Sequence, residues 1–158
     1  MTSSDPSGLY DYQYRWYIGS TAEVGSPQKV MAYFQQHAQD IFPFYLGGCD
    51  ALSAGTTCSL RPIPLAPWMV APVRVTQLGA TSFTFTALPG HFDQPGSTIR
   101  FTVLQQDCGI YLEQTAHGTT NPLADLVAPF VAADTWAQQA ENLRMAVVPG
   151  YLPLPFTD

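Results

Sequence analysis

Three side chains of this 158-residue chain could exchange protons with a substrate: those of His91, Tyr45 and Glu113. His91 ends a Leu-Pro-Gly-His turn between two alternating segments, and a histidine there can reach the mouth of a cavity and titrates near neutral pH. Tyr45 lies in a predicted loop where such a mouth could form. We therefore expect His91 and Tyr45 to be the acid–base pair of a catalytic site, with Glu113 or Gln114 orienting a substrate carbonyl group.

His91 and Glu113 also have ordinary structural explanations. The imidazole of His91 could hold its turn by binding carbonyl groups of the loop. Strand alternation places Gln114 on one face with Ile110 and Leu112, and Glu113 on the opposite face. If the first face is concave, Gln114 is the polar group of the site and Glu113 is solvated. Both faces carry a large apolar residue, so the pattern leaves the choice open.

Aromatic side chains could line a site for a flat or apolar ligand, or form an ordinary core. The chain is 46% hydrophobic and 13% aromatic but only 11% charged, whereas a typical domain is about 25% charged. This deficit is expected if apolar surface lines an internal cavity or a dimer contact, and a surface made neutral by compositional drift explains it equally well. The candidate ligand contacts are Trp16, Trp68, Phe83, Phe85, Phe101, Gln114 and Trp136.

Several classes of function are disfavoured. The net charge is −6 and the six basic residues are scattered singly, so no basic patch for nucleic acid is expected. No Cys or His pair has metal-ligand spacing, and the motifs of nucleotide binding or covalent catalysis are missing, so we expect no metal and no cofactor. The apolar runs are far too short for a membrane span. The first residues lack the features of a signal peptide, which favours a cytoplasmic location.

Three cysteines, Cys49, Cys58 and Cys108, make an odd number. In a chain with no visible export signal we expect reduced cytosolic thiols. A Cys49–Cys58 bridge across the loop rich in Gly, Ser and Thr is the alternative.

Periodicity and capping residues predict the elements that must position these side chains. Residues 10–18 alternate in polarity and predict a strand with its aromatic side chains mostly on one face. Ser26 as N-cap and Pro27 at the first helical position predict a helix whose apolar stripe reaches residue 41. Further strands are expected at residues 56–61, 69–78, 82–87, 98–104 and 109–116, with 82–87 and 98–104 paired as a hairpin.

The last third of the chain reads as helical. Asn121 and Pro122 resemble a helix start, and Pro129 should kink this helix or split it in two, with the second part passing through residues 136–143. The tail at residues 149–158 is apolar and proline-rich, so it could lie in a groove of the domain or on a partner subunit. A homodimer is therefore one expected form.

The order strand, helix, antiparallel strands and long terminal helix predicts a single α+β domain over residues 1–158, with residues 1–9 as a flexible start. A curved antiparallel sheet that grips a long C-terminal helix leaves an internal apolar cavity unless large side chains fill it. Such a cavity is a natural ligand site.

Three segments resemble an uncharacterised branch of the START-like superfamily, also called the helix-grip or SRPBCC group. They are residues 65–75 with Pro67-Trp68, the strand and turn from Phe83 to His91, and residues 99–103. The chain departs from that branch at Thr84-Phe85-Thr86-Ala87, at Ser97-Thr98 and in a shorter amino terminus. The superfamily includes the birch-pollen-allergen fold, lipid-transfer domains and aromatic polyketide cyclases. The resemblance implies the fold and a pocket for a hydrophobic molecule, but no particular activity.

Three functions follow as alternatives. The first is a cofactor-independent cyclase, isomerase or dehydratase that acts on a polyketide-like or terpenoid-like substrate. The second is a non-catalytic carrier or sensor of a lipid-like ligand. A structural protein with a filled core and a docking tail is a third. A titratable side chain with a perturbed pKa inside the site would favour the enzyme, and a site nearly without such groups would favour the binding module.

Overall fold

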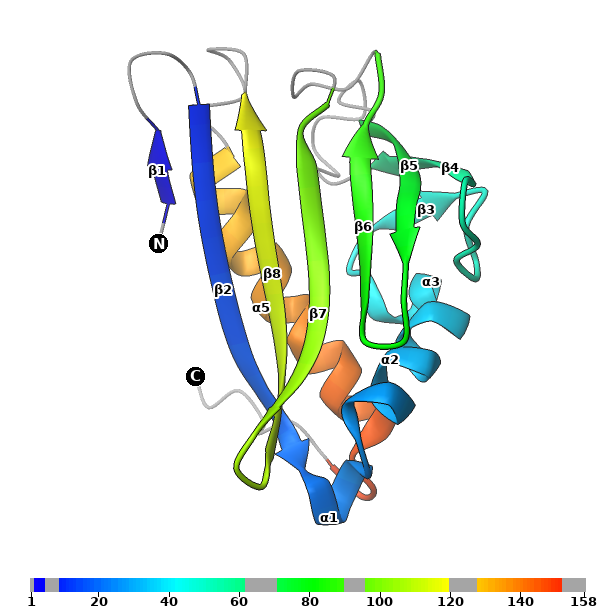
Figure 1. The fold of residues 1–158 in the computed structure, drawn as a ribbon, viewed down its shortest axis with the longest axis vertical. Helices are drawn as coiled ribbons and strands as arrows, with labels where there is room; N and C mark the ends of the chain where they lie inside the picture. The colour runs from blue at the N-terminus through cyan, green and yellow to red at the C-terminus, as the bar shows by residue number, and fades with distance from the viewer. Residues whose placement is uncertain (1, 5–8, 62–70, 90–95, 120–127, 152–158) are drawn as a thin grey trace, which may run out of the picture.

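One antiparallel sheet curves around a long C-terminal helix in the computed structural model of this chain (Figure 1). The structure describes residues 2–4, 9–61, 71–89, 96–119 and 128–151. The strand order is β1-β2-β8-β7-β6-β5-β4-β3, and all neighbours pair antiparallel. The strands are β1 (Thr2–Ser4), β2 (Leu9–Ser20), β3 (Tyr45–Gly47), β4 (Thr57–Arg61), β5 (Ala71–Leu78), β6 (Ser82–Ala87), β7 (Thr98–Gln106) and β8 (Gly109–Thr119). The helices are α1 (Thr21–Val24), α2 (Pro27–Gln36), α3 (Ala38–Ile41) and α5 (Ala128–Val147).

The predicted fold class is confirmed. Helix α5 crosses behind β2 and β8, while α2 and α3 lie beside it towards the β5 and β6 side of the sheet (Figure 1). Among the described residues, α2, α3 and α5 cover one face of the sheet, α1 lies at its lower end, and no helix lies on the opposite face (Figure 1). The described residues hold no helix that is both long and apolar enough to cross a membrane.

The two alternating segments at residues 82–87 and 98–104 form the expected hairpin as β6 and β7. Phe85 pairs with Ile99, and the hairpin closes where Ala87 N donates to Ser97 O at 2.7 Å. Gly96 has φ +94°, a backbone conformation that glycine adopts without strain. The turn itself, including His91, lies outside the described residues.

Helix α2 begins as predicted but ends earlier. Ser26 Oγ accepts a hydrogen bond from Lys29 N at 3.1 Å, and Pro27 occupies the first turn, where a missing N–H costs no helical bond. His37 then leaves the helical conformation with φ −126° and ψ 37°, and α3 follows as a separate short helix. The apolar stripe survives this break, because Phe34, Ala38 and Ile41 are all fully buried.

Helix α5 runs without interruption from Ala128 to Val147. Pro129 lies in its first turn, so it neither kinks nor splits the described helix, and residues 121–127 lie outside the description. Trp136, Ala140 and Leu143 are buried, which confirms the helical spacing expected for this stretch.

The expectation of reduced thiols is wrong for two of the three cysteines. Cys49 and Cys58 form a disulfide with their Cα atoms 5.6 Å apart, and both side chains are buried. The reason is tertiary: β3 and β4 pair with Gly47 opposite Ser59, which brings the two flanking cysteines together. Cys108 is exposed and free.

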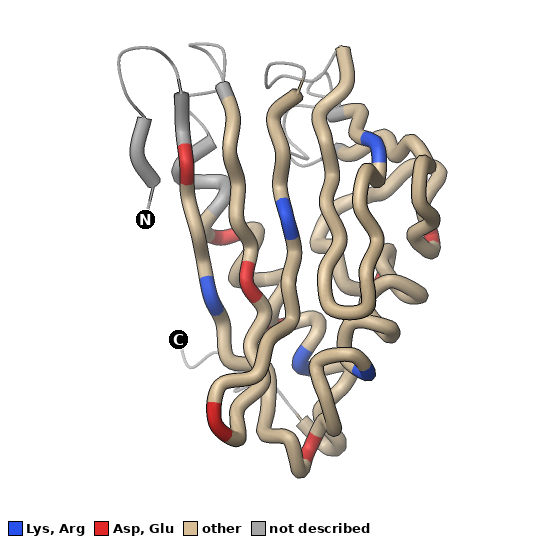
Figure 2. Tube along the Cα trace, in the orientation of Figure 1, with Lys and Arg blue, Asp and Glu red and all other residues tan. Residues whose placement is uncertain are grey.

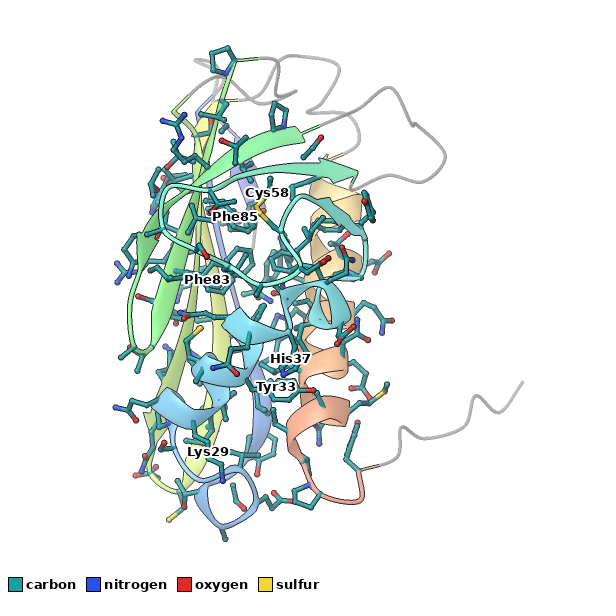
Figure 3. The ribbon with its side chains drawn as sticks, turned by 90° about the vertical axis from the view of Figure 1, so that its right-hand side faces the viewer. Lys29, Tyr33, His37, Cys58, Phe83 and Phe85 are labelled. Atoms are coloured by element: carbon teal, nitrogen blue, oxygen red, sulfur yellow. A yellow bond between two sulfur atoms is a disulfide. The ribbon has the colours of Figure 1, made fainter. Side chains whose placement is uncertain are left out.

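Six phenylalanines pack against one another on the helix-covered face of the sheet; we call them the phenylalanine cluster. Figure 3 shows Phe83 and Phe85 on β6, and rings from α2 and the segment after α3 lie against them. The ring centroids of Phe83 and Phe101 are 4.7 Å apart, and those of Phe42 and Phe101 are 5.3 Å apart. The cluster consists of Phe34, Phe42, Phe44, Phe83, Phe85 and Phe101, each at most 9% exposed.

Candidate functional site

The inner face of β2 carries a ladder of aromatic side chains opposite α5. Tyr12, Tyr14 and Trp16 alternate with exposed residues, and all three are half-buried. Their ring centroids follow one another at 5.3 Å and 6.0 Å. This ladder lies on the concave side of the sheet yet retains accessible surface, unlike the phenylalanine cluster.

Beside the ladder, two fully buried glutamines are joined by their side-chain amides. Trp16 Nε1 donates to Gln114 Oε1 at 2.8 Å. Gln114 Nε2 donates to Gln139 Oε1 at 2.9 Å and to the backbone oxygen of Trp136 at 3.3 Å. Trp16 and Gln114 come from neighbouring strands and Gln139 from α5, so this amide chain connects the sheet to the helix.

The amide chain ends in a buried donor with no hydrogen-bond partner among the described residues, Gln139 Nε2. Gln139 is 0% exposed and is flanked on α5 by the buried side chains of Trp136 and Leu143. An unsatisfied buried donor costs about 1–3 kcal/mol, and native proteins hold few of them. The only similar atom in the described part of the chain is Arg144 Nε, whose guanidinium carbon lies 4.4 Å from the centroid of the Tyr151 ring.

Trp136 stands at the boundary between the amide chain and the phenylalanine cluster. Its indole Nε1 donates to Tyr12 Oη at 2.9 Å, and its backbone oxygen accepts from Gln114. Its ring lies 5.4 Å from that of Phe101, centroid to centroid. One residue of α5 therefore contacts both regions of the inner face.

The structure resolves which face of β8 looks inward. Ile110, Leu112 and Gln114 are fully buried, so Gln114 is the inward polar group. Glu113 lies on the outer face, where its carboxylate pairs with the Arg15 guanidinium at 2.8 Å.

The other predicted site residues are dispersed. Tyr45 is 61% exposed on β3, and the strands β7, β6, β5 and β4 separate it from Glu113 on β8. Phe83, Phe85 and Phe101 belong to the phenylalanine cluster, whereas Trp16, Gln114 and Trp136 meet in one place. His91 and Trp68 lie outside the described residues.

Charges in the described part of the chain are few (Figure 2). The two that adjoin the amide chain in sequence, Arg15 and Glu113, pair with each other on the outer face of the sheet. A hydrogen bond from the Ser20 backbone N–H lowers the pKa of the Glu23 carboxyl group. The Tyr151 hydroxyl donates to Glu141 Oε1 at 2.6 Å, which raises the pKa of Tyr151. Glu23 lies in α1 and Tyr151 follows α5, so both belong to one end of the molecule (Figure 1). Within the described residues, no three His, Cys, Asp or Glu side chains are grouped to hold a metal ion.

Gln139 was not among the residues predicted for the site. A glutamine on a helix normally indicates a solvent-facing position. Its spacing gives the opposite indication, since it lies three residues after Trp136 and four before Leu143, on the buried stripe of α5.

Comparison with known proteins identifies relatives by fold alone. No protein-family model matches the chain, and no curated protein matches its sequence. Ginseng major latex-like protein 151, from Panax ginseng, is 12% identical over 90% of this chain and 99% of its own, with a TM-score of 0.66. Norcoclaurine synthase from Thalictrum flavum, in complex with dopamine and hydroxybenzaldehyde, is 10% identical over 97% of each chain, with a TM-score of 0.64. The Aha1 dimer of Colwellia psychrerythraea is 18% identical over 89% of this chain and 97% of its own, with a TM-score of 0.60.

Proposed function

We propose that this chain, which has the helix-grip fold of the START-like superfamily, binds a hydrophobic small molecule between the inner face of β2 and β8 and helix α5. The observation that carries this proposal is the Gln139 donor, which has no partner among the described residues and lies on the helix side of a face with many apolar side chains. Ligand sites are mostly apolar, with a few placed polar groups that fix orientation. A ligand oxygen on Gln139 Nε2 would satisfy that donor.

The half-buried ladder supports the same location. Tyr12, Tyr14 and Trp16 offer flat, partly accessible surface within reach of the glutamine pair. The rings of the phenylalanine cluster, by contrast, are buried against one another and leave almost no accessible surface for a ligand. We therefore place the ligand against the ladder and assign Phe83, Phe85 and Phe101 to its supporting wall.

We favour a carrier or sensor over an enzyme. The hydrogen-bonding groups of the amide chain are amides and indoles, which do not exchange protons near neutral pH. Glu23, whose pKa is lowered, and Tyr151, whose pKa is raised, lie at another end of the molecule. Polar groups of this kind orient a ligand, and a binding module requires no more than that.

A cyclase, isomerase or dehydratase acting on a polyketide-like or terpenoid-like substrate is the second candidate. It is favoured by the phenol groups of Tyr12 and Tyr14 on the same inner face, because a phenol can act as an acid or a base. An enzyme, norcoclaurine synthase, shares the fold. Catalytic roles for His91, Tyr45 and Glu113 stay predictions, and Glu113 would have to act from the outer face.

The expected compartment and assembly also stay predictions. A disulfide is rare in a reducing cytosol, so cell fractionation tests the cytoplasmic location, and a thiol count on the protein from each fraction tests the Cys49–Cys58 bond. A homodimer of this chain is tested by sedimentation.

The test of the proposed function is binding of methyl naphthyl ketone, a flat and apolar probe. We expect one molecule to bind per chain, visible by native mass spectrometry. In nitrogen–proton NMR spectra the indole signals of Trp16 and Trp136 should shift, while the signal of Cys108 on the distant β7–β8 turn should not. The proposal would be overturned if the protein bound neither this ketone nor lipids, and if no apolar molecule co-purified with it. Binding with shifts confined to other residues would overturn the location.

A further inference from the structure

We infer that Trp16 fixes which way the buried amides of Gln114 and Gln139 point, so that the site presents a hydrogen-bond donor. The site therefore selects a neutral ligand that carries a hydrogen-bond acceptor, such as a ketone. This inference rests on the proposed function and names the chemical class of its ligand. The selecting atom is Gln139 Nε2, and Trp16 acts on it through Gln114.

The first step is that the orientation of the Gln114 amide is determined by its partners. A glutamine amide has an accepting oxygen and a donating nitrogen at nearly equivalent positions. The indole N–H of Trp16 can only donate, so the atom that faces it at 2.8 Å must be Gln114 Oε1. A backbone carbonyl can only accept, so the oxygen of Trp136 at 3.3 Å requires Gln114 Nε2. The two partners agree.

The second step carries this orientation to Gln139. Because Gln114 presents its nitrogen, the atom of Gln139 that lies 2.9 Å away must be the accepting oxygen. The nitrogen of Gln139 is then the end left over, and it is the atom without a partner among the described residues. Reversing Gln139 would place two N–H groups against each other inside a buried region.

The third step concerns the ligand. A ligand oxygen that accepts from Gln139 Nε2 gains a bond, whereas a hydrocarbon leaves the donor unsatisfied and an N–H group of the ligand meets another donor. A carboxylate would bring a charge into an amide and aromatic surrounding, which costs more than burying a neutral oxygen. A neutral carbonyl compound with a flat apolar body therefore fits best.

The experiment compares methyl naphthyl ketone with isopropenyl naphthalene, in which a CH₂ group replaces the carbonyl oxygen with little change of shape. The unmodified protein should bind the ketone about tenfold more tightly by calorimetry. Gln139→Met keeps a long unbranched side chain but has no donor, so the ratio should fall to within about twofold while the hydrocarbon still binds. Gln138→Met, on the exposed side of the same helix, is the matched control and should leave the ratio unchanged.

A second measurement needs no variant. The carbonyl stretching frequency of the bound ketone should be lower than in an apolar solvent, because Gln139 donates to it. Equal affinities for ketone and hydrocarbon in the unmodified protein, or an unshifted stretch, would overturn the inference and leave the proposed function standing. If neither compound binds, the proposed function and the inference fail together.

Discussion

The helix-covered face of the sheet is built differently on its two sides. Towards β6 and β7, six phenylalanines enclose one another and leave almost no exposed surface. Towards β2 and β8, the aromatic side chains remain half-buried, and hydrogen bonds through Gln114 and Gln139 connect the layers. Both sides are rich in aromatic residues, so aromatic content does not distinguish a core from a site. The two sides are distinguished by the buried amides of Gln114 and Gln139, whose hydrogen-bond donors and acceptors have a fixed orientation.

The largest expected effect is on the phenylalanine cluster. Phe101→Ala removes a ring that contacts five other aromatic rings and should lower the free energy of unfolding by about 3–5 kcal/mol. Denaturant titration measures it. Thr102→Ala, the next residue with its side chain on the outer face, is the control and should change stability by no more than about 0.5 kcal/mol. Equal losses for the two variants would contradict a closed core on this side.

The disulfide stabilises the same side by a smaller amount. Replacing Cys49 and Cys58 together by Ala opens a loop of sequence separation 9 and should lower the free energy of unfolding by about 2–3 kcal/mol. Cys108→Ala, at an exposed free cysteine, should leave it unchanged. An unfolding midpoint insensitive to the double replacement would show that β3 and β4 hold together without the bond.

On the other side, Trp16→Phe tests the amide chain. It leaves Gln114 Oε1 buried without its donor and should cost about 1–2 kcal/mol of unfolding free energy. The ketone preference should weaken as well, since Gln114 then keeps only its bond to Trp136 O as an orienting partner. If Trp16 had only a structural role, Trp16→Phe would lower stability and leave the preference for the ketone unchanged. Tyr17→Phe, at an exposed position of the same strand, removes a hydroxyl outside the amide chain and should do neither.

The smallest expected effect is that of pH. Ketone binding should stay constant from about pH 5.5 to about pH 9, because amides and indoles do not titrate there. Two described groups with shifted pKa values should make stability depend on pH outside this range. The lowered pKa of Glu23 contributes stability above its ordinary value of 4.5, and this is lost as the pH falls. The raised pKa of Tyr151 contributes stability below the ordinary value of 10.0. This stability is lost as the pH rises through the raised pKa of the folded protein. A bell-shaped profile would favour the enzyme instead.

Long periodic segments were predictable because each repeats one rule many times. The alternation around Phe83, Phe85 and Phe101 predicts the β6–β7 hairpin, and the caps of Ser26 predict the start of α2. The break at His37 has no glycine or proline to mark it, so the sequence pattern continues past it. Strands of three residues such as β1 and β3 are too short to show a period, and their pairing comes from the rest of the sheet.

The site was predictable only in part. Alternation narrowed Gln114 and Glu113 to two arrangements, but the inward face depends on where α5 packs, which no local pattern contains. The Cys49–Cys58 bond likewise needs the β3–β4 register before its geometry is known. The spacing of Gln139 from Trp136 and Leu143 indicates a buried position on α5. It was not predicted because glutamine on a helix usually lies at the surface.

The position of Trp136 makes its intrinsic fluorescence sensitive to ligand binding. Its ring borders the phenylalanine cluster, its indole N–H bonds Tyr12, and its backbone oxygen binds Gln114. A molecule that displaces either of the last two contacts changes the polarity around a natural fluorophore. Emission from Trp136 should therefore register events on both sides of the inner face, and an added dye is unnecessary.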